Sequence, residues 1–474
     1  MFKLNPALRD FWKTQKPYKL LKGGRFCHAL GEKVVMYNGE IRKVEDVRKG
    51  DLLLGPDSKP REVLDIHSGH DDLYRVDQAS GISYTVNSAH ILALKRAKNA
   101  GKGKPLKNGG FSTRYPLGDT TAMNVVDFMN TSDKFKTVYR GYNAQNIEFN
   151  KKNTLLDPYF IGLWLGDGSS DCASITNMDV EIEEYIYAYA GSLGLVVRKR
   201  ELPNNRAHTY YIVSESRINP IMQSLREYGI LTHFGKIEDG RKRIKVDKRI
   251  PFDYLTSCRD DRLKVLAGLV DSDGTYSKDK GVMCITSSKE NLAGDIKYLV
   301  DSLGFKSSLI KREVGCQGGY TGIAWTISFS GALSKIPCKI ERKKVFTDSK
   351  RGVGISSLKV TPAGYGEYVG FTVSDDHLYL LEDFTVLHNS SKTQDAGGMA
   401  AFLARNYSVR FLCIRQFQNR ISDSVFTVVK QKIEEAGWRD EFDIGVSTIR
   451  HKVTCSEFLF YGIARNINDI KGTE

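Results

Sequence analysis

Two stretches of the chain show the same succession of apolar and polar positions. Apolar residues recur at helical spacing over residues 180–193 and again over residues 292–303. Alternating segments typical of strands follow each helix, at residues 196–201 and 209–214 in the first stretch and 306–314 and 323–330 in the second. Shorter identities, such as Ser-Leu-Gly at 192 and at 302, keep the same order. The pattern predicts an αββαββα unit that occurs twice between residues 157 and 345.

A short apolar helix ending in Asp-Gly is predicted at the start of each unit, over residues 158–168 and 263–274. A glycine after a helix is usually only a cap, but here the arrangement occurs twice. The small residues that would let the two helices pack closely are Gly162, Gly166, Ala267 and Gly268. Such packing would bring Asp167 and Asp273 together, and paired carboxylates favour a divalent cation that activates water and stabilises the leaving oxygen of a phosphodiester.

The positive charge of the chain is concentrated in two places. The formal net charge is +14, and residues 95–152 and 1–26 hold surpluses of eight and six positive charges. This predicts a polyanionic partner, with a flexible loop as the alternative explanation of the central stretch. Eight cysteines without Cys-x-x-Cys spacing, and no long apolar run, favour a soluble chain in a reducing cytoplasm that is not bound to membranes.

Both Asp-Gly segments resemble the motifs of LAGLIDADG homing endonucleases, and Leu-Ala-Gly-Leu-Val-Asp-Ser-Asp-Gly at 266–274 is nearly literal. The resemblance implies cleavage of double-stranded DNA with Mg²⁺. The ligands it implies are the side chains of Asp167 and Asp273 and the carbonyls of Gly166 and Ser272. It also places Lys248 near the attacking water, with Lys344 as its counterpart in the second half. A solvated or phosphate-binding charge is the alternative for both lysines.

The segments on either side of the repeat are rich in predicted strands and turns, and their ends resemble the splice junctions of inteins. An amide is cleaved without protease only if a side-chain nucleophile attacks it and a following reaction consumes the resulting ester. Cys27 would attack the carbonyl of Phe26 to form a thioester. His90 matches the family's conserved histidine and would protonate the leaving nitrogen, while Asn87 would hydrogen-bond the developing oxyanion.

The other end of the element supplies the later steps. Ser390 would accept the acyl group, and Asn389 would cyclise to release the element with help from His388 and His377. No cofactor is implied. Taken alone, Cys27 could be a buried small residue, His90 a histidine in a strand, and His388-Asn389 a dipeptide in a loop. Only their order along the chain makes splicing the better interpretation. Many inteins have Thr at the position of Asn87 and Asp at that of Gly370, so the splicing rate stays open.

Removal of residues 27–389 would join two flanks into a Gly-x-x-x-x-x-Lys-Thr phosphate-binding loop. Its predicted nucleotide-binding residues are Gly23, Gly24, Arg25, Lys392 and Thr393. A strand at 409–414 and a helix at 421–435 predict a βαβ arrangement, and the flanks resemble the large terminase subunit of tailed bacteriophages. That family implies ATP with Mg²⁺, a small subunit and a portal as partners. Since the acidic strand of the ATP site is not found in the sequence, no ATPase activity is expected.

The expected fold is multidomain: a β-rich Hint splicing domain with an inserted α+β LAGLIDADG endonuclease, flanked by fragments of an α/β P-loop ATPase. The expected boundaries are 1–26 for the first flank, 27–94 and 347–389 for the splicing domain, 95–154 for a basic DNA-contacting insertion, 155–346 for the endonuclease and 390–474 for the second flank. The intein is expected to be monomeric. The alternatives are a terminase ATPase with an inactive DNA-binding insertion, and a DNA-binding protein derived from a dead endonuclease.

Overall fold

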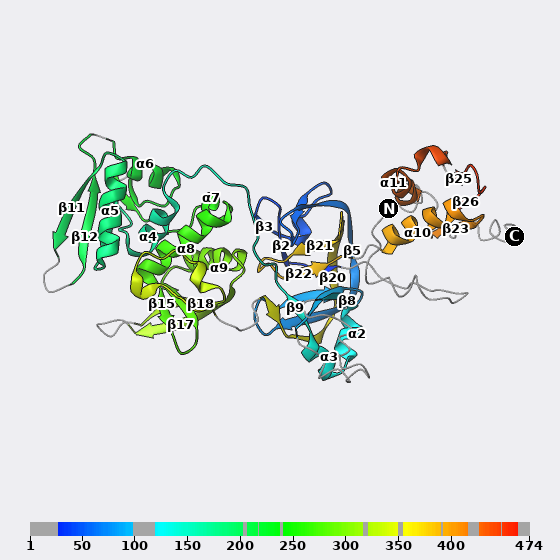
Figure 1. The fold of residues 1–474 in the computed structure, drawn as a ribbon, viewed down its shortest axis with the longest axis horizontal. Helices are drawn as coiled ribbons and strands as arrows, with labels where there is room; N and C mark the ends of the chain where they lie inside the picture. Colours follow the sequence, from blue (N-terminus) through cyan, green and yellow to red (C-terminus); the bar gives the residue numbers. More distant parts are fainter. Residues whose placement is uncertain are drawn as a thin grey trace, which may run out of the picture. The chain divides into compact units, whose positions relative to one another are not determined.

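The structure is a computed structural model that describes residues 27–97, 119–201, 206–216, 218–237, 240–315, 321–348, 354–389, 392–415, 426–446 and 448–462. The chain divides into two compact units. The larger contains residues 27–120 and 124–388, and the other, called here the C-terminal unit, contains residues 121–123 and the residues from Asn389 onward. The larger unit contains a β-rich region, residues 27–148 and 354–388, and a repeated region, residues 157–345 (Figure 1). None of the described helices is long and apolar enough to cross a membrane.

The β-rich region is built from two main sheets and a small one. The first sheet has the order β20-β1-β6-β5-β4, and its strands are β20 (Leu358–Val373), β1 (His28–Ala29), β6 (Tyr84–Asn87), β5 (Pro60–Gln78) and β4 (Leu52–Leu54). The second has the order β19-β9-β7-β22-β21, with β19 (Ile355–Ser356), β9 (Tyr139–Tyr142), β7 (Ile91–Arg96), β22 (Val386–His388) and β21 (Leu378–Leu380). The remaining elements are β2 (Lys33–Val35), β3 (Ile41–Lys43), β8 (Thr120–Asn124), α2 (Val125–Asn130) and α3 (Asp133–Val138). Strands from both ends of the region therefore share each main sheet.

The stretch 95–154 is not the separate basic insertion that the sequence suggested. Strand β9 pairs with β7 through Lys95 and Arg140, and with β19 through Tyr142 and Ile355. Ala144, Ile147 and Phe149 are buried in the core of the larger unit. The many charges of this stretch obscured the apolar residues that fix it to the sheet, and its most basic part, residues 98–118, lies outside the described residues.

Each half of the repeated region packs two main helices against a sheet. The first half contains α4 (Pro158–Asp167), β10 (Ser174–Asn177), α5 (Val180–Ser192), β11 (Val196–Glu201), β12 (His208–Val213), α6 (Pro220–Glu227), β13 (His233–Ile237) and β14 (Gly240–Ile244). The second contains α7 (Phe252–Leu255), α8 (Arg259–Asp273), β15 (Thr275–Ser277), β16 (Val282–Ser287), α9 (Glu290–Ser302), β17 (Lys306–Gly315) and β18 (Thr321–Ser330). The sheet orders are β10-β12-β11 and β15-β16-β18-β17. The helices and strands expected at 180–330 are confirmed to within two residues at each end.

The two halves depart from an ideal αββαββα unit in different ways. In the first half Gly168 forms only an isolated bridge with Ile175, so a full strand does not develop between α4 and β10. A tight turn explains this, because the Ser169 N–H donates to the Ser174 carbonyl. In the second half a single 3-10 turn, Leu333–Lys335, stands where the last helix was expected.

The C-terminal unit contains α10 (Lys392–Asn406), β23 (Arg410–Arg415), α11 (Thr427–Glu435), β24 (Phe442–Ile444), β25 (Ile449–His451) and β26 (Glu457–Gly462). The sheet order is β23-β26-β25-β24, and β23 runs parallel to β26. The expected strand at 409–414 and the βαβ arrangement are confirmed. The start of the helix predicted at 421 and the loop residues Gly23, Gly24, Arg25, Ser390 and Ser391 lie outside the described residues, as do the side chains of Lys392 and Thr393.

Candidate functional site

Helices α4 and α8 touch backbone to backbone. A Cβ atom at Gly162 would lie 2.1 Å from the carbonyl oxygen of Val265, and one at Gly268 would lie 2.3 Å from that of Tyr159. No larger side chain fits at either position unless the helices separate. The small residues identified in the sequence thus form the contact between the two helices, as expected.

This packing sets Asp167 and Asp273 at the same end of the helix pair. A Cβ at Gly166 would lie 3.1 Å from Oδ2 of Asp273, and Asn177 Nδ2 donates to Oδ2 of Asp167 at 2.7 Å. Burial, with a contribution from the Asp273 charge, raises the pKa of Asp167 to about 6. Loss of water raises the pKa of Asp273 as well, although this residue is the more exposed of the two.

A lysine lies at the end of each helix, half-buried at α4 and buried at α8. Lys248 Nζ donates to the carbonyl oxygens of Trp164, Leu165 and Gly168 at 2.8, 3.2 and 2.6 Å. Lys343 Nζ donates to those of Val270, Asp271 and Ser272 at 2.9, 2.8 and 2.9 Å. Each ammonium group satisfies carbonyls left open at a helix C-terminus. Burial lowers the pKa of Lys248 to about 8 and also lowers the pKa of Lys343.

Lys343 therefore occupies the position that the sequence assigned to Lys344. The Lys344 side chain is 38% exposed and pairs with Glu341 at 2.6 Å. Lys343 is 7% exposed because it ends a 3-10 turn, Glu341–Lys343, that directs it toward α8. Within the run Arg342-Lys343-Lys344 no sequence pattern distinguishes the buried lysine from the exposed one.

Cys27, at the start of the β-rich region, is buried beside the end of β6. Its N–H donates to Oδ1 of Asn87 at 3.1 Å, and the Asn87 N–H donates to the Cys27 carbonyl at 3.1 Å. Nδ2 of Asn87 donates to Asp71 at 3.2 Å. Asn87 thus contacts the nitrogen of Cys27 through its acceptor oxygen, whereas the sequence had suggested that it donates to an oxyanion.

His90 lies in the turn that joins β6 to β7. One end of the region pairs with β6 and the other end pairs with β7. His28, next to Cys27, pairs with Val86 in β6, and His388 pairs with Ile91 in β7. His90 is completely buried between them, and its ring centroid lies 5.4 Å from that of His28. Burial, with the neighbouring His28 and His388, lowers the pKa of His90 well below its ordinary value. Burial, with the neighbouring His377, lowers the pKa of His388 to about 3.

His377 and Asn389 complete the second end. The centroids of the His377 and His388 rings are 6.5 Å apart. His377 has a φ of +62°, and its Nδ1–H donates to the Val373 carbonyl at 2.7 Å. Asn389 follows His388 directly and is 4% exposed. Phe26 and Ser390, on the far sides of the two junctions, lie outside the described residues.

The sequence did not single out His28 and Tyr379. His28 Nε2 and the Tyr379 hydroxyl are 2.5 Å apart, and both side chains are fully buried. Burial lowers the pKa of His28 to about 4. The adjacent Cys-His pair at 27–28 was the available signal, but a histidine at a strand end has no fixed role in isolation.

Comparison with protein-family models assigns three parts of the chain. Residues 27–115 match the homing-endonuclease-associated Hint family, residues 260–332 match the LAGLIDADG-like domain, and residues 388–474 match the phage terminase large subunit. Each model matches less than half of the chain, and together they show a Hint segment, a LAGLIDADG-like segment and a terminase segment in one chain. Its Hint domain, LAGLIDADG domain and terminase domain follow one another in this order, as the sequence motifs predicted.

Two curated relatives match long segments at low identity. The replicative DNA helicase DnaB of Mycobacterium intracellulare is 26% identical over 317 residues, in a match that covers 65% of this chain and 48% of that protein. The catalytic subunit of the V-type proton ATPase of Candida tropicalis is 22% identical over 478 residues, covering 77% of this chain and 43% of that protein. The chain thus spans less than half the length of these two curated relatives.

Solved structures match parts of this chain at low similarity. The homing endonuclease I-DmoI in complex with DNA and Mn is 11% identical and has a TM-score of 0.25, covering 37% of this chain and 88% of its own. The gp41-1 intein is 16% identical with a TM-score of 0.15, and the match covers 22% of this chain and 61% of that chain.

Proposed function

We propose that residues 27–389 excise themselves and join the two terminase segments, and that the excised element cleaves double-stranded DNA at a specific site. One observation supports splicing above all others. Cys27 and His388 are 361 positions apart, yet they lie beside the two strands that flank the turn of His90. The two ends of the segment proposed to excise itself therefore lie on either side of the turn that contains His90.

The first step follows from the contacts of Cys27. Its sulfur attacks the Phe26 carbonyl carbon, the C–S bond forms and the C–N bond breaks, and the thiol proton is balanced by the proton that the Cys27 nitrogen gains. Asn87 orients that nitrogen through the 3.1 Å hydrogen bond, and His90 delivers the proton. A neutral imidazole is suited to proton relay because it can both accept and release a proton.

The later steps use the other end. Ser390 takes the acyl group from Cys27. The Asn389 side-chain nitrogen then attacks its own main-chain carbonyl, a succinimide forms, and the Asn389–Ser390 bond breaks with one proton passing to the Ser390 nitrogen. His388 precedes Asn389 directly and its ring centroid lies 6.5 Å from that of His377, and these two imidazoles would orient the carbonyl and move protons. The remaining ester shifts to an ordinary peptide bond.

For the LAGLIDADG domain we propose hydrolysis of a DNA phosphodiester. The pair Asp167 and Asp273 fits a hard divalent cation, because carboxylate oxygens are the preferred ligands and loss of water, which raises both pKa values, makes the two negative charges costly without a cation. The described residues contain no cluster of three or more His, Cys, Asp or Glu side chains, so water and phosphate oxygens would complete the shell. The Ser272 carbonyl already accepts from Lys343.

When bound, the cation would polarise a phosphodiester and lower the pKa of water. Lys248 and Lys343 each hold a positive charge at Nζ next to the acidic pair, where the attacking and leaving oxygens of DNA carry their charge. With a pKa of about 8, Lys248 is also able to exchange a proton near neutral pH. Mg²⁺ is the proposed cation.

Two assays test this function separately. Expression of the 474-residue precursor should yield an excised 363-residue species and a ligated 111-residue species, and Cys27→Ala should give neither. A plasmid carrying the uninterrupted terminase coding sequence should be cut in the presence of Mg²⁺ and remain intact with EDTA. A precursor that stays a single band argues against splicing, and a plasmid that is never cut argues against the nuclease.

A further inference from the structure

Helix α9 of the LAGLIDADG domain touches the Hint domain through Tyr298. The Tyr298 hydroxyl donates to the Gly39 carbonyl at 2.8 Å, and its side chain is 9% exposed. Gly39 lies in the turn between β2 and β3 with a φ of +89°, and a Cβ there would lie 2.3 Å from Cγ2 of Thr256. Two nuclease side chains therefore pack against one Hint turn.

The same tyrosine packs against the turn that leads to the second splice junction. The Tyr298 and Phe384 rings are 5.3 Å apart in an edge-on arrangement. Phe384 is fully buried and has a φ of +62°, a backbone conformation that a phenylalanine adopts only under constraint from its surroundings. Strand β22 begins two residues later and ends on His388.

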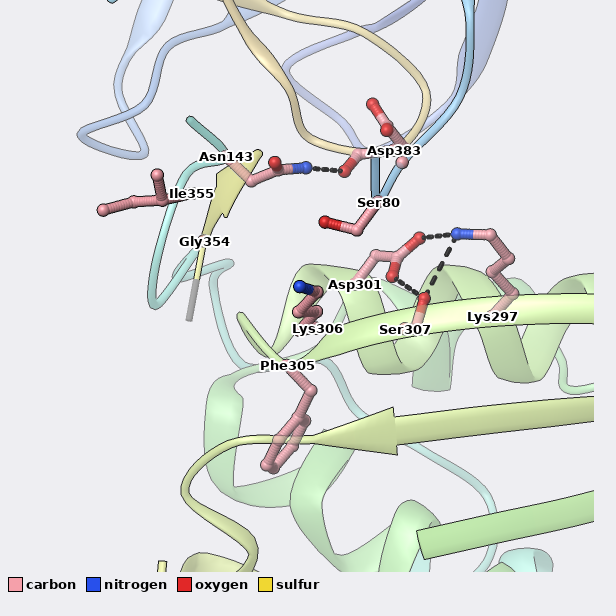
Figure 2. A pocket seen from close by; sticks show the side chains of 11 residues that line it. Ser80, Asn143, Lys297, Asp301, Phe305, Lys306, Ser307, Gly354, Ile355 and Asp383 are labelled. Carbon is pink, nitrogen blue, oxygen red and sulfur yellow. Dashed lines mark hydrogen bonds and ion pairs between the residues drawn. The ribbon is translucent and has the colours of Figure 1, made fainter. Parts of the chain in front are cut away.

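A second contact holds this turn. Asp383 accepts from the Ile82 and Thr385 N–H groups at 2.9 and 3.1 Å, and its carbonyl accepts from Asn143 Nδ2 at 2.8 Å. Figure 2 shows Asp383 and Asn143 across from Lys297, Asp301 and Ser307 of the LAGLIDADG domain, which line the same small pocket. Lys297 Nζ is 2.5 Å from Asp301, and Ser307 donates to the same carboxylate.

We propose that Tyr298 is a positioning residue for the cyclisation of Asn389, so that the nuclease domain supports the second half of the splicing reaction. This inference rests on the proposed splicing function. The reasoning is that the strained Phe384 backbone fixes where β22 starts, and β22 determines where His388 and Asn389 lie. Cys27 is held instead by Asn87 and β6, so the first step does not depend on this contact.

The experiment measures thioester formation and cyclisation separately, each in a precursor in which a substitution blocks the other step. Cyclisation is followed as C-terminal cleavage in the Cys27→Ala precursor, and thioester formation is followed as hydroxylamine cleavage in the Asn389→Ala precursor. Tyr298→Phe should slow C-terminal cleavage about fivefold, the factor that corresponds to one buried hydrogen bond. Tyr298→Ala should slow it further, and hydroxylamine cleavage should stay unchanged in both.

Tyr254→Phe is the matched control. It also removes a buried tyrosine hydroxyl that donates to a main-chain carbonyl, that of Leu156 at 2.9 Å, but both partners belong to the nuclease side. Its C-terminal cleavage should equal that of the parent. Equal rates for the Tyr298 variants and their parent, or equal slowing of both steps, would overturn the inference. A Cys27→Ala parent without any C-terminal cleavage would instead contradict the splicing function itself.

Discussion

The splice-junction cluster is buried and the nuclease pair is partly shielded from water, and loss of water has opposite consequences for their pKa values. Around Cys27 the ionisable groups are imidazoles, and burial lowers the pKa values of His28 and His388 to about 4 and about 3. At the ends of α4 and α8 the groups are carboxylates whose pKa values are raised. The imidazoles of the first cluster are therefore neutral, whereas the second cluster holds charge that a cation and DNA would balance.

The largest effect is expected for Asp167→Asn. The substitution keeps the hydrogen-bonding shape but removes a negative charge next to Asp273, so cation binding and water activation are lost. DNA cleavage should fall by about 1,000-fold, on the scale of the several kcal/mol that a catalytic metal supplies. Plasmid cleavage at several Mg²⁺ concentrations measures this. Splicing of the same variant should remain at the wild-type rate, and a parallel loss of both activities would contradict the separation of the two sites.

A smaller effect is expected at the lysines, where the structure differs from the sequence-based assignment. Lys343→Ala removes three buried hydrogen bonds and the charge beside the acidic pair, so cleavage should fall by about 100-fold. Lys344→Ala is the matched control, because it loses only a largely exposed ion pair that contributes about 0.5 kcal/mol. Plasmid cleavage rates of the two variants are compared. A larger loss for Lys344→Ala than for Lys343→Ala would show that Lys344 is the counterpart of Lys248, as the sequence suggested.

The pH dependence of stability should come mainly from the imidazole cluster. The folded pKa of His28 is about 4 against an ordinary value of 6.5, so the unfolded state binds more protons between these values. Stability is present above pH 6.5 and is lost as the pH falls toward 4. From pH 7 to pH 5 the loss should be about 2 kcal/mol for this residue, measured by urea unfolding. His28→Gln should flatten the profile, and an unchanged slope would show that the burial of His28 is not the cause.

A further effect, on stability alone, concerns the contact between the two helices. Gly162→Ala would set a methyl group 2.1 Å from a backbone oxygen, and overpacking of this kind costs about 1 to 3 kcal/mol. Gly294→Ala is the control, since no atom lies within 4 Å of its added Cβ in helix α9 and alanine favours helices. Thermal unfolding should show a lower melting temperature for the first variant and an equal or higher one for the second.

Most of the fold could be predicted because it depends on local patterns. The helices at Val180 and Glu290 and the strands after them follow their periodicities, and the glycines at 162 and 268 indicated the helix contact directly. The sequence could not show which of Lys343 and Lys344 lies at the end of α8, because this depends on the residue at which one 3-10 turn ends.

The roles of Asn87 and Tyr379 were equally hidden from the sequence. Asn87 meets Cys27 across 60 positions, and Tyr379 meets His28 across 351. Such contacts arise from strand pairing between distant segments, for which a single sequence provides no local signal. The assignment of residues 95–154 to a basic insertion failed for a related reason, because β9 finds its partners in β7 and β19.

Mass spectrometry of the expressed precursor tests the central claim most directly. The account predicts a 111-residue product with a peptide that joins Phe26 to Ser390, and a 363-residue product that ends in a succinimide or its hydrolysed form at Asn389. Asn389→Ala should abolish both while the chain stays folded. An intact 474-residue chain at every pH and incubation time, or cleavage without the joined peptide, would contradict it.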